Sequence, residues 1–382
     1  MKILFLGEYS RLHNTLKEGL NALGHEVVIV SDGDFFKNYP TDIDISSRLK
    51  KYFLTRFFVK GFHRFSKIDL FQREREFRLK KIIPQLKNFD VVQLVNQDPF
   101  VIRPKEEIKI LKSIFKQNKK SFALACGDDS LVIDYYEQKK MRYSILTPVH
   151  LGKIPKNKMN YSYKYLKNSY KKLYDFVNKN VLGFIPTDLD YAIPYAGNSK
   201  DLGLIPNPVN IDKIKCNKLI INDKINIFFG VNTMSFYKKG GDIVLKVLEQ
   251  LKENYKDLIQ IEIAENLPYD EYIKKYDQAH IFIDQLYSYD QGYNALEAMA
   301  KGKCVLTGAE KEFKDFYNLQ EEVAVNALPD KKQLFDTLES LIQDKERIIR
   351  IGQNARKFIE KNHNYIAIAN KYLKIWTRTE RH

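Results

Sequence analysis

The feature that most constrains this chain is an alternation of short apolar strands with amphipathic helices, which occurs twice along its 382 residues. Residues 2–6 (KILFL) and 26–30 (EVVIV) are continuous apolar runs, and residues 14–23 between them place leucines at helical spacing. This succession indicates a βαβ unit, whose parallel strands are buried on both faces. Further strands are predicted at 89–95 and 121–126, with a helix over 105–118.

A second alternation follows residues 183–210, a stretch rich in Pro and Gly that we take as the domain boundary. The predicted strands are 225–230, 259–264, 280–284 and 303–306, and the predicted helices are 240–254, 269–277, 292–300, 331–342, 344–360 and 364–376. The sequence therefore predicts an α/β chain of two doubly wound, Rossmann-like domains, 1–200 and 201–362. In such a chain a ligand is expected in the cleft between the domains, at the carboxyl ends of the strands.

Composition excludes several classes of protein. Apolar residues make up 44% of the chain and aromatic residues 13%, which is enough to build packed cores. The three cysteines form no CxxC pair, which argues against a disulfide framework or a zinc ribbon and favours a reducing compartment. The seven histidines show no HxxxH or HExxH spacing, so no metal site is predicted.

No apolar run approaches the roughly 18 residues that a membrane-spanning helix needs. The apolar run at 2–6 is also too short for the core of a signal peptide. We therefore expect a cytoplasmic protein. Its positive charge also allows it to attach to the inner face of the cell membrane.

The net charge of +15 lies entirely in the first half of the sequence. Residues 1–200 hold 36 Lys and Arg against 21 Asp and Glu, whereas residues 201–382 hold 27 of each kind. The densest part, 48–67, has seven Lys or Arg, no acid, and aromatic residues at helical steps. This pattern is typical of an amphipathic helix that lies on an anionic membrane, and equally of a solvated helix packed on its domain. No motif for nucleic-acid binding accompanies it, so nucleic acid is not expected as a partner.

Lys and Tyr also interleave over 152–180. This stretch predicts either a surface that faces an acceptor or a lipid, or an ordinary solvated helix and loop.

The most informative stretch is 284–306, where an irregular loop enters a helix at Gly292. A helix that begins at Gly presents backbone N–H groups and the positive end of its dipole, which suits a diphosphate. Glu297 lies just over one turn inside this helix and can accept hydrogen bonds from ribose hydroxyls. Alone, each feature is common, since a Glu on a helix is most often solvated.

The run Glu297-Ala298-Met299-Ala300-Lys301-Gly302, followed by Val305, resembles the donor-binding signature of retaining GT-B glycosyltransferases, in particular family 4. Gly292 falls on the Gly of that signature. The signature begins with another Glu, which usually contacts the donor sugar, and here that position is Tyr289. The resemblance then implies that sugar recognition differs, or that the adjacent Asp290 replaces the missing Glu.

Other segments of the second half agree with this resemblance in order and spacing. The run 204–210 resembles the interdomain turn of the family, and 230–240 resembles its phosphate-binding element. In that element Lys239 matches a phosphate-binding Lys, whereas the family's Arg is absent and Asn232 stands near its place. The last helices resemble those that close the fold, so 363–382 is expected to cross back to the first domain.

The resemblance assigns roles to individual residues. Lys239 and Glu297 are the expected catalytic residues of the second domain, because stabilisation of the leaving diphosphate is the main catalytic contribution. The residues expected to bind the donor are Asn232, Lys238, Lys239, Asp290, Gly292, Tyr293, Asn294, Ala295 and Glu297.

In the first domain the loop after the first strand is expected to face the acceptor. Gly7 permits close approach of the backbone, and Arg11 or His13 can meet a phosphate or an acceptor. The alternative is that this loop only caps the next helix. Members of the family often carry a His after a later strand; here that place reads Asp128-Asp129, so Asp128 is our catalytic candidate and Asp129 an acceptor-side candidate. Both can instead cap the following helix.

The resemblance therefore implies a GT-B glycosyltransferase of the hexosyltransferase type, independent of metal ions and of any cofactor. It is expected to move a sugar from a UDP- or GDP-linked donor, with retention, to a glycan or lipid-linked acceptor in cell-surface polysaccharide assembly. Two alternatives stay open. One is a nucleotide-sugar epimerase on the same fold, and the other is a non-catalytic GT-B relic that binds a membrane or nucleic acid.

Overall fold

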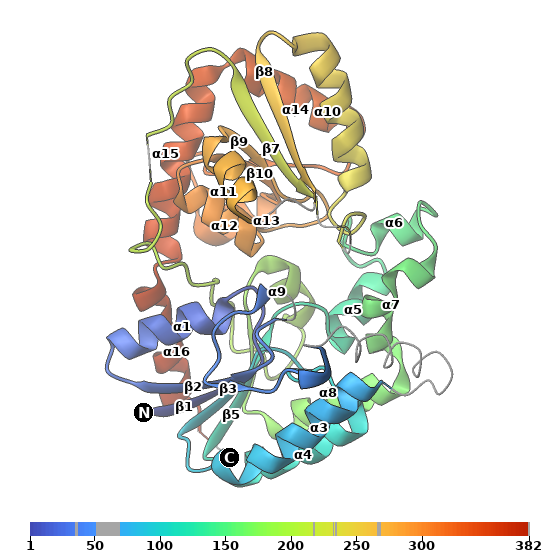
Figure 1. Cartoon of the computed structure of the whole chain (residues 1–382), viewed down its shortest axis with the longest axis vertical. Helices are drawn as coiled ribbons and strands as arrows, with labels where there is room; N and C mark the ends of the chain where they lie inside the picture. Colours follow the sequence, from blue (N-terminus) through green and yellow to red (C-terminus); the bar gives the residue numbers. More distant parts are fainter. Residues whose placement is uncertain are drawn as a thin grey trace. The chain divides into compact units, whose positions relative to one another are not determined.

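Two parallel sheets organise the chain (Figure 1). The computed structural model describes residues 1–34, 37–50, 69–216, 218–231, 233, 235–265 and 269–380. The chain divides into two compact units, each described here by itself. Unit 1 comprises 1–134, 161–208 and 365–382, and unit 2 comprises 135–160 and 209–364.

The sheet of unit 1 has the strand order β3-β2-β1-β4-β5-β6, which is the order of a Rossmann domain. Its strands are β1 (Lys2–Leu6), β2 (Glu26–Ser31), β3 (Ile43–Asp44), β4 (Val91–Leu94), β5 (Lys120–Ala125) and β6 (Phe184–Pro186). All pairs are parallel, and Ile3 is in register with Val27 on one side and with Val91 on the other. Because helices cover both faces, residues 3–6 of β1 are wholly buried, which explains their continuous apolar sequence.

Helices lie on both faces of this sheet. Helices α1 (Leu12–Ala22) and α16 (Tyr365–Arg378) pack together, and so do α4 (Pro104–Lys116) and α8 (Asn168–Asn180), with α3 (Leu70–Ile82) beside α4. Among the described residues, the remaining helical segments of the unit are η2 (Arg48–Lys50), η3 (Ile83–Gln85), α7 (Asn160–Tyr163), η5 (Lys164–Leu166) and α9 (Leu189–Tyr195), and α5 (Ser130–Glu137) begins in it.

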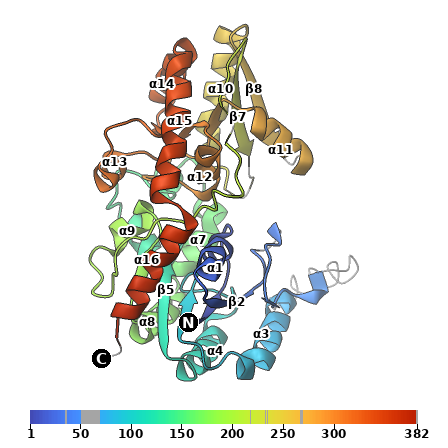
Figure 2. The ribbon, with the colours of Figure 1, turned by 90° about the vertical axis from the view of Figure 1, so that its left-hand side faces the viewer.

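The C-terminal helix α16 belongs to unit 1, which confirms the expected return of the last helix to the first domain. It lies along α1 (Figure 2). The contact is close because α1 has Gly19 there: a Cβ at this position would lie 2.4 Å from the carbonyl oxygen of Tyr365. Trp376 of α16 is wholly buried, with its ring 6.3 Å from that of Phe5 in β1.

The sheet of unit 2 has the order β11-β10-β9-β7-β8, and all of its pairs are parallel. Its strands are β7 (Ile225–Val231), β8 (Ile259–Glu265), β9 (Ile281–Ile283), β10 (Cys304–Thr307) and β11 (Val325–Asn326). Its helices are α6 (Thr147–His150), η4 (Lys156–Met159), α10 (Gly241–Tyr255), α11 (Tyr269–Gln278), α12 (Tyr293–Ala300), α13 (Lys311–Tyr317), α14 (Lys331–Gln343) and α15 (Lys345–Asn362).

Residues 135–160, which the sequence analysis placed in the first domain, cluster with unit 2. The Arg142 guanidinium donates to Glu312 at 2.6 Å and to Glu310 at 2.9 Å, and the hydroxyl of Tyr143 also bonds to Glu310. These partners follow β10, far from residue 142 in sequence, so their pairing could not be read from local patterns.

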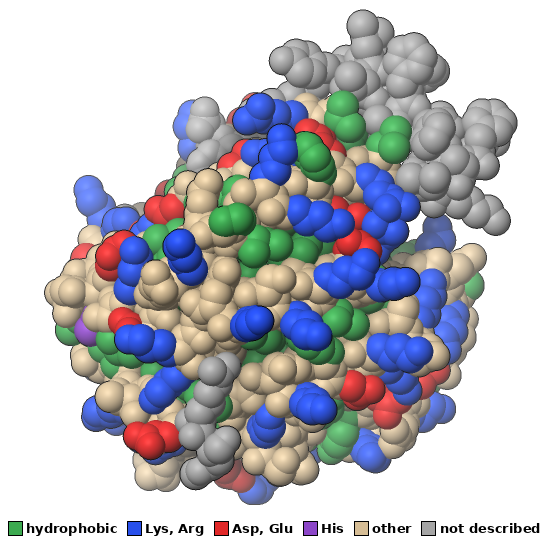
Figure 3. All heavy atoms as spheres, turned by 90° about the horizontal axis from the view of Figure 1, so that it is seen from below, with side chains coloured by type: hydrophobic (Ala, Val, Ile, Leu, Met, Phe, Trp, Pro, Cys, Tyr) green, Lys and Arg blue, Asp and Glu red, His purple; other side chains and the backbone are tan. Residues whose placement is uncertain are grey.

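Helix α4 gives unit 1 a basic outer face. Its four lysines, Lys105, Lys109, Lys112 and Lys116, recur at helical spacing and are all exposed. Figure 3 shows the side of the molecule on which α3 and α4 lie, where Lys and Arg side chains outnumber acidic ones. Of the predicted membrane segment 48–67, residues 51–67 lie outside the part of the chain that the structure describes. Within that part, no helix has the length and apolar character needed to span a membrane.

Candidate functional site

The strand order of unit 2 reverses between β7 and β9, because the chain leaves β7 toward β8 on one side and reaches β9 on the other. Ligands of open α/β sheets bind at the carboxyl ends of the strands beside such a switch point. The loop after β7 carries Lys238 and Lys239, and the loop after β9 runs from Asp284 to Gly292. The N–H of Leu286 donates to the carbonyl of Lys239 at 3.0 Å, so the two loops are joined directly.

Lys239 and Asp284 form an ion pair across this switch point. The Lys239 Nζ lies 2.6 Å from the Asp284 Oδ1, with 26% of the lysine side chain exposed and 1% of the aspartate side chain. The turn between Lys239 and α10 requires Gly240, which has a φ of +78° and packs against Leu286. The buried carboxylate of Asp284 therefore fixes the position of the Lys239 ammonium, while about a quarter of the lysine side chain is exposed.

Helix α12 starts beside this pair. Gly292 is its N-cap, with no side-chain cap, and its carbonyl accepts from the N–H of Leu296 at 3.1 Å. As in any α-helix, the N–H groups of the first turn, on Tyr293, Asn294 and Ala295, point out of the helix end. A Cβ at Gly292 would lie 3.2 Å from the Asp284 Oδ2, which shows how near the buried carboxylate is to this end.

Glu297 is half-buried on α12, and Lys238 is half-buried before Lys239. The structure thus brings Lys239 and the start of α12 together at one switch point, with Asp284 between them. Asn232 lies outside the residues that the structure describes. The roles of Lys238, Lys239, Glu297 and Asn232 in binding a donor stay predictions.

Tyr289, which stands where the family signature has its first Glu, is 2% exposed and serves as a packing residue. Its hydroxyl accepts from the backbone N–H of Arg142 at 2.9 Å, and the Arg142 guanidinium lies 4.6 Å from the centre of its ring. The ring of Tyr143 is 5.2 Å away. Tyr289 therefore fastens residues 135–160 to the rest of unit 2.

Asp290 is also buried, at 4% exposure, and its Oδ1 accepts from the N–H of Gln291 at 2.8 Å. The loop around it is pressed against Gly308, where a Cβ would lie 2.4 Å from the carbonyl oxygen of Ser288. This tight packing fixes the conformation of the loop that leads into α12. Whether Asp290 contacts a donor stays a prediction.

In unit 1 the loop after β1 is shaped by packing. Gly7 has a φ of +83°, and a Cβ there would lie 2.5 Å from Val95. His13 is wholly buried and stacked on Phe5; its Nδ1 donates to the Gly7 carbonyl at 2.7 Å, and burial lowers its pKa to about 4. In this structure His13 is therefore a packing residue, and its contact with an acceptor stays a prediction. Arg11 is partly exposed and lies 3.1 Å from Glu18.

Asp129 caps α5, which was the alternative that the sequence left open. Its Oδ1 accepts from the N–H of Val132 at 2.7 Å, and its Oδ2 accepts from the hydroxyl of Tyr195 at 2.7 Å. It is 1% exposed, and burial raises its pKa to about 6. Asp129 therefore has the capping role that the sequence left open, and its acceptor-side role stays a prediction. Asp128 is half-buried and accepts a hydrogen bond from Ser162, and its catalytic role stays a prediction.

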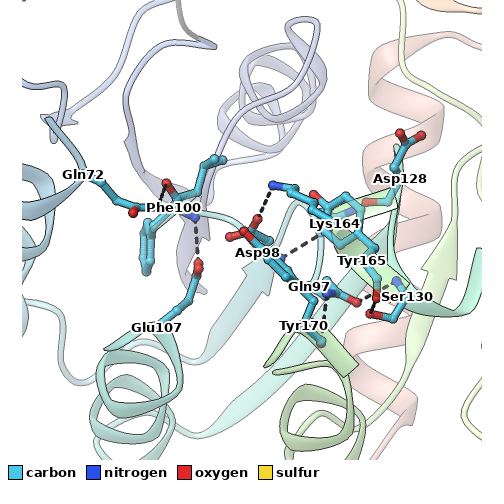
Figure 4. Close-up of polar contacts among 12 residues, drawn as sticks. Gln72, Gln97, Asp98, Phe100, Glu107, Asp128, Ser130, Lys164, Tyr165 and Tyr170 are labelled. Carbon is cyan, nitrogen blue, oxygen red and sulfur yellow. Dashed lines mark hydrogen bonds and ion pairs between the residues drawn. The ribbon is translucent and has the colours of Figure 1, made fainter. Parts of the chain in front are cut away.

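Sequence reasoning missed a buried polar cluster at the carboxyl end of β4 (Figure 4). Asp98 is wholly buried and lies 2.8 Å from the Lys164 ammonium. Burial, reinforced by the charge of Asp98, raises the pKa of Glu107 well above its usual value, and the Glu107 Oε1 accepts from the N–H of Phe100 at 2.9 Å. Gln97 accepts from the N–H of Ser130 at 2.9 Å. The signal in the sequence was the polar run at 96–98 directly after an apolar strand.

Asp284 was missed in the same way, because it closed a predicted strand and was not read as a site residue. Across the described residues, no group of three or more His, Cys, Asp or Glu side chains is arranged to hold a metal ion.

Comparison with known proteins agrees with this architecture. Residues 234–374 match the family model described as glycosyl transferase-like. A search of curated proteins finds no match to the sequence.

Among solved structures, sucrose-phosphate synthase of Thermosynechococcus elongatus is 15% identical with a TM-score of 0.57, and 99% of each chain is covered. Anabaena HepE, in complex with UDP and glucose, is 12% identical with a TM-score of 0.59, over 99% of this chain and 100% of that one. A Listeria monocytogenes protein assigned as a UDP-N-acetylglucosamine 2-epimerase is 12% identical with a TM-score of 0.51, over 98% and 95%. The fold is therefore that of the GT-B class, with two Rossmann-like domains.

Proposed function

We propose that this protein is a glycosyltransferase that uses a nucleotide sugar, and that unit 2 binds the donor. The observation that carries the proposal is the meeting of Lys239 with the N-terminus of α12 at the switch point of the sheet. An ammonium and a helix N-terminus both attract phosphate, and such sites bind diphosphates without further elements. The match of 234–374 to the glycosyl transferase-like family covers this site.

The donor is held by two groups of residues. Lys239, Lys238 and the first-turn N–H groups of α12 bind the diphosphate and stabilise it as it leaves. Glu297 accepts hydrogen bonds from the ribose. Anabaena HepE, of similar fold, has been solved with UDP and with UDP-glucose, which supports UDP as the first nucleotide to test; GDP is the second.

The transferred group is a hexose, and the reaction retains the configuration of its anomeric carbon without a metal ion. The acceptor is a glycan or a lipid-linked glycan of the cell surface, presented near unit 1. The basic outer face of α4 and the segment 48–67 attract an anionic membrane surface, where such acceptors reside. We propose on this basis that the enzyme acts peripherally on the inner face of the cell membrane.

The test of the donor site is calorimetric titration with UDP, GDP and their sugars. We expect binding by the native protein, and a loss of binding and of nucleotide release in Lys239→Ala and Glu297→Ala. Full binding and turnover in both variants would show that the site is assigned wrongly. Flotation with vesicles of anionic and of neutral lipid tests the membrane claim, with and without the charges of 48–67. Equal flotation of both proteins would contradict it.

Two other functions have specific support. A similar fold in the Listeria protein assigned as a UDP-N-acetylglucosamine 2-epimerase supports nucleotide-sugar epimerisation as an alternative. The use of Tyr289 for packing, where the signature has a Glu, is compatible with a relic that has lost transfer. Release of UDP from UDP-glucose only when an acceptor is present identifies a transferase. Interconversion of sugars without net transfer identifies an epimerase, and silence toward every nucleotide identifies a relic.

A further inference from the structure

Asp284 combines a rigid position with an unused hydrogen-bonding atom. It follows β9 directly, and its N–H donates to the carbonyl of Leu306 at 2.9 Å, so its backbone belongs to the sheet. The residue is 3% exposed. Its Oδ1 bonds to Lys239, whereas its Oδ2 is buried and has no hydrogen-bond partner among the described residues.

A buried carboxylate oxygen without a partner is costly, and proteins seldom leave one. This oxygen is directed toward the start of α12, because a Cβ at Gly292 would lie only 3.2 Å from it. Any side chain at 292 would press on the carboxylate, so Gly292 keeps the approach to Oδ2 clear. The N-terminus of α12 and the Oδ2 of Asp284 therefore lie next to each other in unit 2.

The chemistry of a carboxylate limits what it can bind. An ionised carboxylate only accepts hydrogen bonds, so its partner must be an O–H or N–H group. A phosphate cannot be that partner, because its oxygens are also negative and also accept. A nucleotide sugar supplies the required donor on its transferred sugar, next to its diphosphate.

We propose that Asp284 recognises the transferred sugar. Its Oδ1 positions the Lys239 ammonium for the diphosphate, and its Oδ2 accepts a hydrogen bond from a sugar hydroxyl. This inference rests on the proposed function and extends it, since it assigns to Asp284 the contact that Tyr289 does not make. Asp284 has the same charge as the missing Glu but belongs to the end of β9, five residues earlier in the chain.

The test compares two ligands that differ only in the sugar. Affinities of UDP and UDP-glucose, and of GDP and GDP-mannose, are measured for the native protein and for Asp284→Asn. The amide removes the negative charge but keeps the shape of the side chain. We expect the preference for the nucleotide sugar over the nucleoside diphosphate to fall about tenfold, which is the range for a hydrogen bond to a charged group. Affinity for the bare diphosphate is expected to hold or rise, because the amide no longer repels phosphate.

Asp277→Asn is the matched control. Asp277 pairs with Lys301 in the same unit, but its side chain is 51% exposed, and the pair lies at the C-terminal end of α12. This variant removes one carboxylate and one ion pair, and we expect its preference for the sugar to equal that of the native protein. If Asp284→Asn does not fold, the double variant Lys239→Met/Asp284→Asn leaves no unpaired charge, and we expect it to show the same tenfold loss of preference.

The outcomes separate the two proposals. If the native protein binds none of the four nucleotides, the proposed function fails and this inference falls with it. If the native protein binds them and Asp284→Asn lowers UDP and UDP-glucose equally, Asp284 only supports Lys239, and the inference alone is overturned. The inference is supported if Asp284→Asn loses affinity for the nucleotide sugar but not for the nucleoside diphosphate.

Discussion

The switch points of the two sheets occupy equivalent places in two similar topologies, yet different side-chain contacts are found at each. In unit 1 the point between β1 and β4 is closed by packing, since a Cβ at Gly7 would lie 2.5 Å from Val95, and by the Asp98–Lys164 pair. In unit 2 the point between β7 and β9 holds the Lys239–Asp284 pair and the start of α12, and the Asp284 Oδ2 has no hydrogen-bond partner among the described residues.

Both points carry a buried acid and a lysine, so burial and charge alone do not distinguish them. Asp98 and Glu107 of unit 1 bond to Lys164 and to the N–H of Phe100, although each also has one buried oxygen without a hydrogen-bond partner among the described residues. Asp284 of unit 2 has one such oxygen too, but that oxygen lies beside the N-terminus of α12. The neighbouring helix end, and not the unpaired oxygen alone, is why we propose a ligand at Asp284.

The largest expected effect comes from removing each lysine in turn. In Lys239→Met, Asp284 stays buried without its partner, and we expect a loss of about 3 kcal/mol in unfolding free energy and about a hundredfold in UDP affinity. In Lys164→Met we expect a similar loss of stability, because Asp98 also stays buried without its partner, but an unchanged nucleotide affinity, because this pair is not part of the proposed donor site. Calorimetry measures both quantities. An equal loss of nucleotide binding in Lys239→Met and Lys164→Met would contradict the proposed difference between the two switch points.

The second effect is a pH dependence confined to unit 1. Burial raises the pKa of Asp129 from 3.8 to about 6, so the folded state favours the protonated carboxyl. The resulting stability is present below about pH 4 and is lost as the pH rises through 6. Relative to Asp129→Asn, the native protein should lose roughly 3 kcal/mol between pH 4 and 7.

Urea unfolding, followed by the fluorescence of Trp376, measures this pH dependence. Trp376 is the single tryptophan of the chain and is buried in unit 1. A difference between the two proteins that does not change with pH would show that Asp129 is not titrating in this range.

The third effect tests how the approach to α12 is fixed. In Gly308→Ala the new Cβ would meet backbone atoms of Ser288 and Asp290 at 2.4 and 2.6 Å, so the loop must move. We expect a cost of about 2 kcal/mol and weaker nucleotide binding, measured by calorimetry. Gly197→Ala serves as the control, since no atom lies within 4 Å of its Cβ position. Unchanged binding in Gly308→Ala would mean that the loop does not shape the site.

The smallest effect concerns the packing of residues 135–160. The side chain of Arg142 is 52% exposed, so its ion pairs with Glu310 and Glu312 are partly screened by water. Arg142→Ala is expected to cost less than about 1 kcal/mol. Because Tyr289 is used here for packing, UDP affinity should stay within a factor of about two of the native value. A tenfold loss in titration would give Tyr289 or Arg142 a part in binding.

Much of the fold could be predicted from the sequence, because buried parallel strands leave an unmistakable apolar signature. The predicted strand 2–6 matches β1, and the other predicted strands match within two residues at each end. The elements that were missed, such as β3, β6 and β11, are two or three residues long, too short to carry a period. Helix α3 was missed because only one narrow stripe of it, at residues 75, 76 and 79, is buried.

The candidate site was predicted only in part, and for a similar reason. Local sequence marks the start of α12, because Gly292 and the run from Glu297 lie close together in the chain. It does not show that Lys239 pairs with Asp284, since 45 residues separate them and the strand order alone brings them together. His13 and Asp129 were read as accessible for the opposite reason, because burial by distant helices is invisible in a local pattern.

The sequence by itself determined the two α/β domains, the start of α12 and the concentration of positive charge in the first half, because each depends on residues that are neighbours in the chain. Tertiary structure alone decided which polar residues are satisfied and which are not. The cost of an unpaired buried group depends on atoms that come from distant segments. The packing of distant segments therefore decided that Asp98 lies beside Lys164, whereas Asp284 lies between Lys239 and the start of α12, where we propose that it meets a ligand.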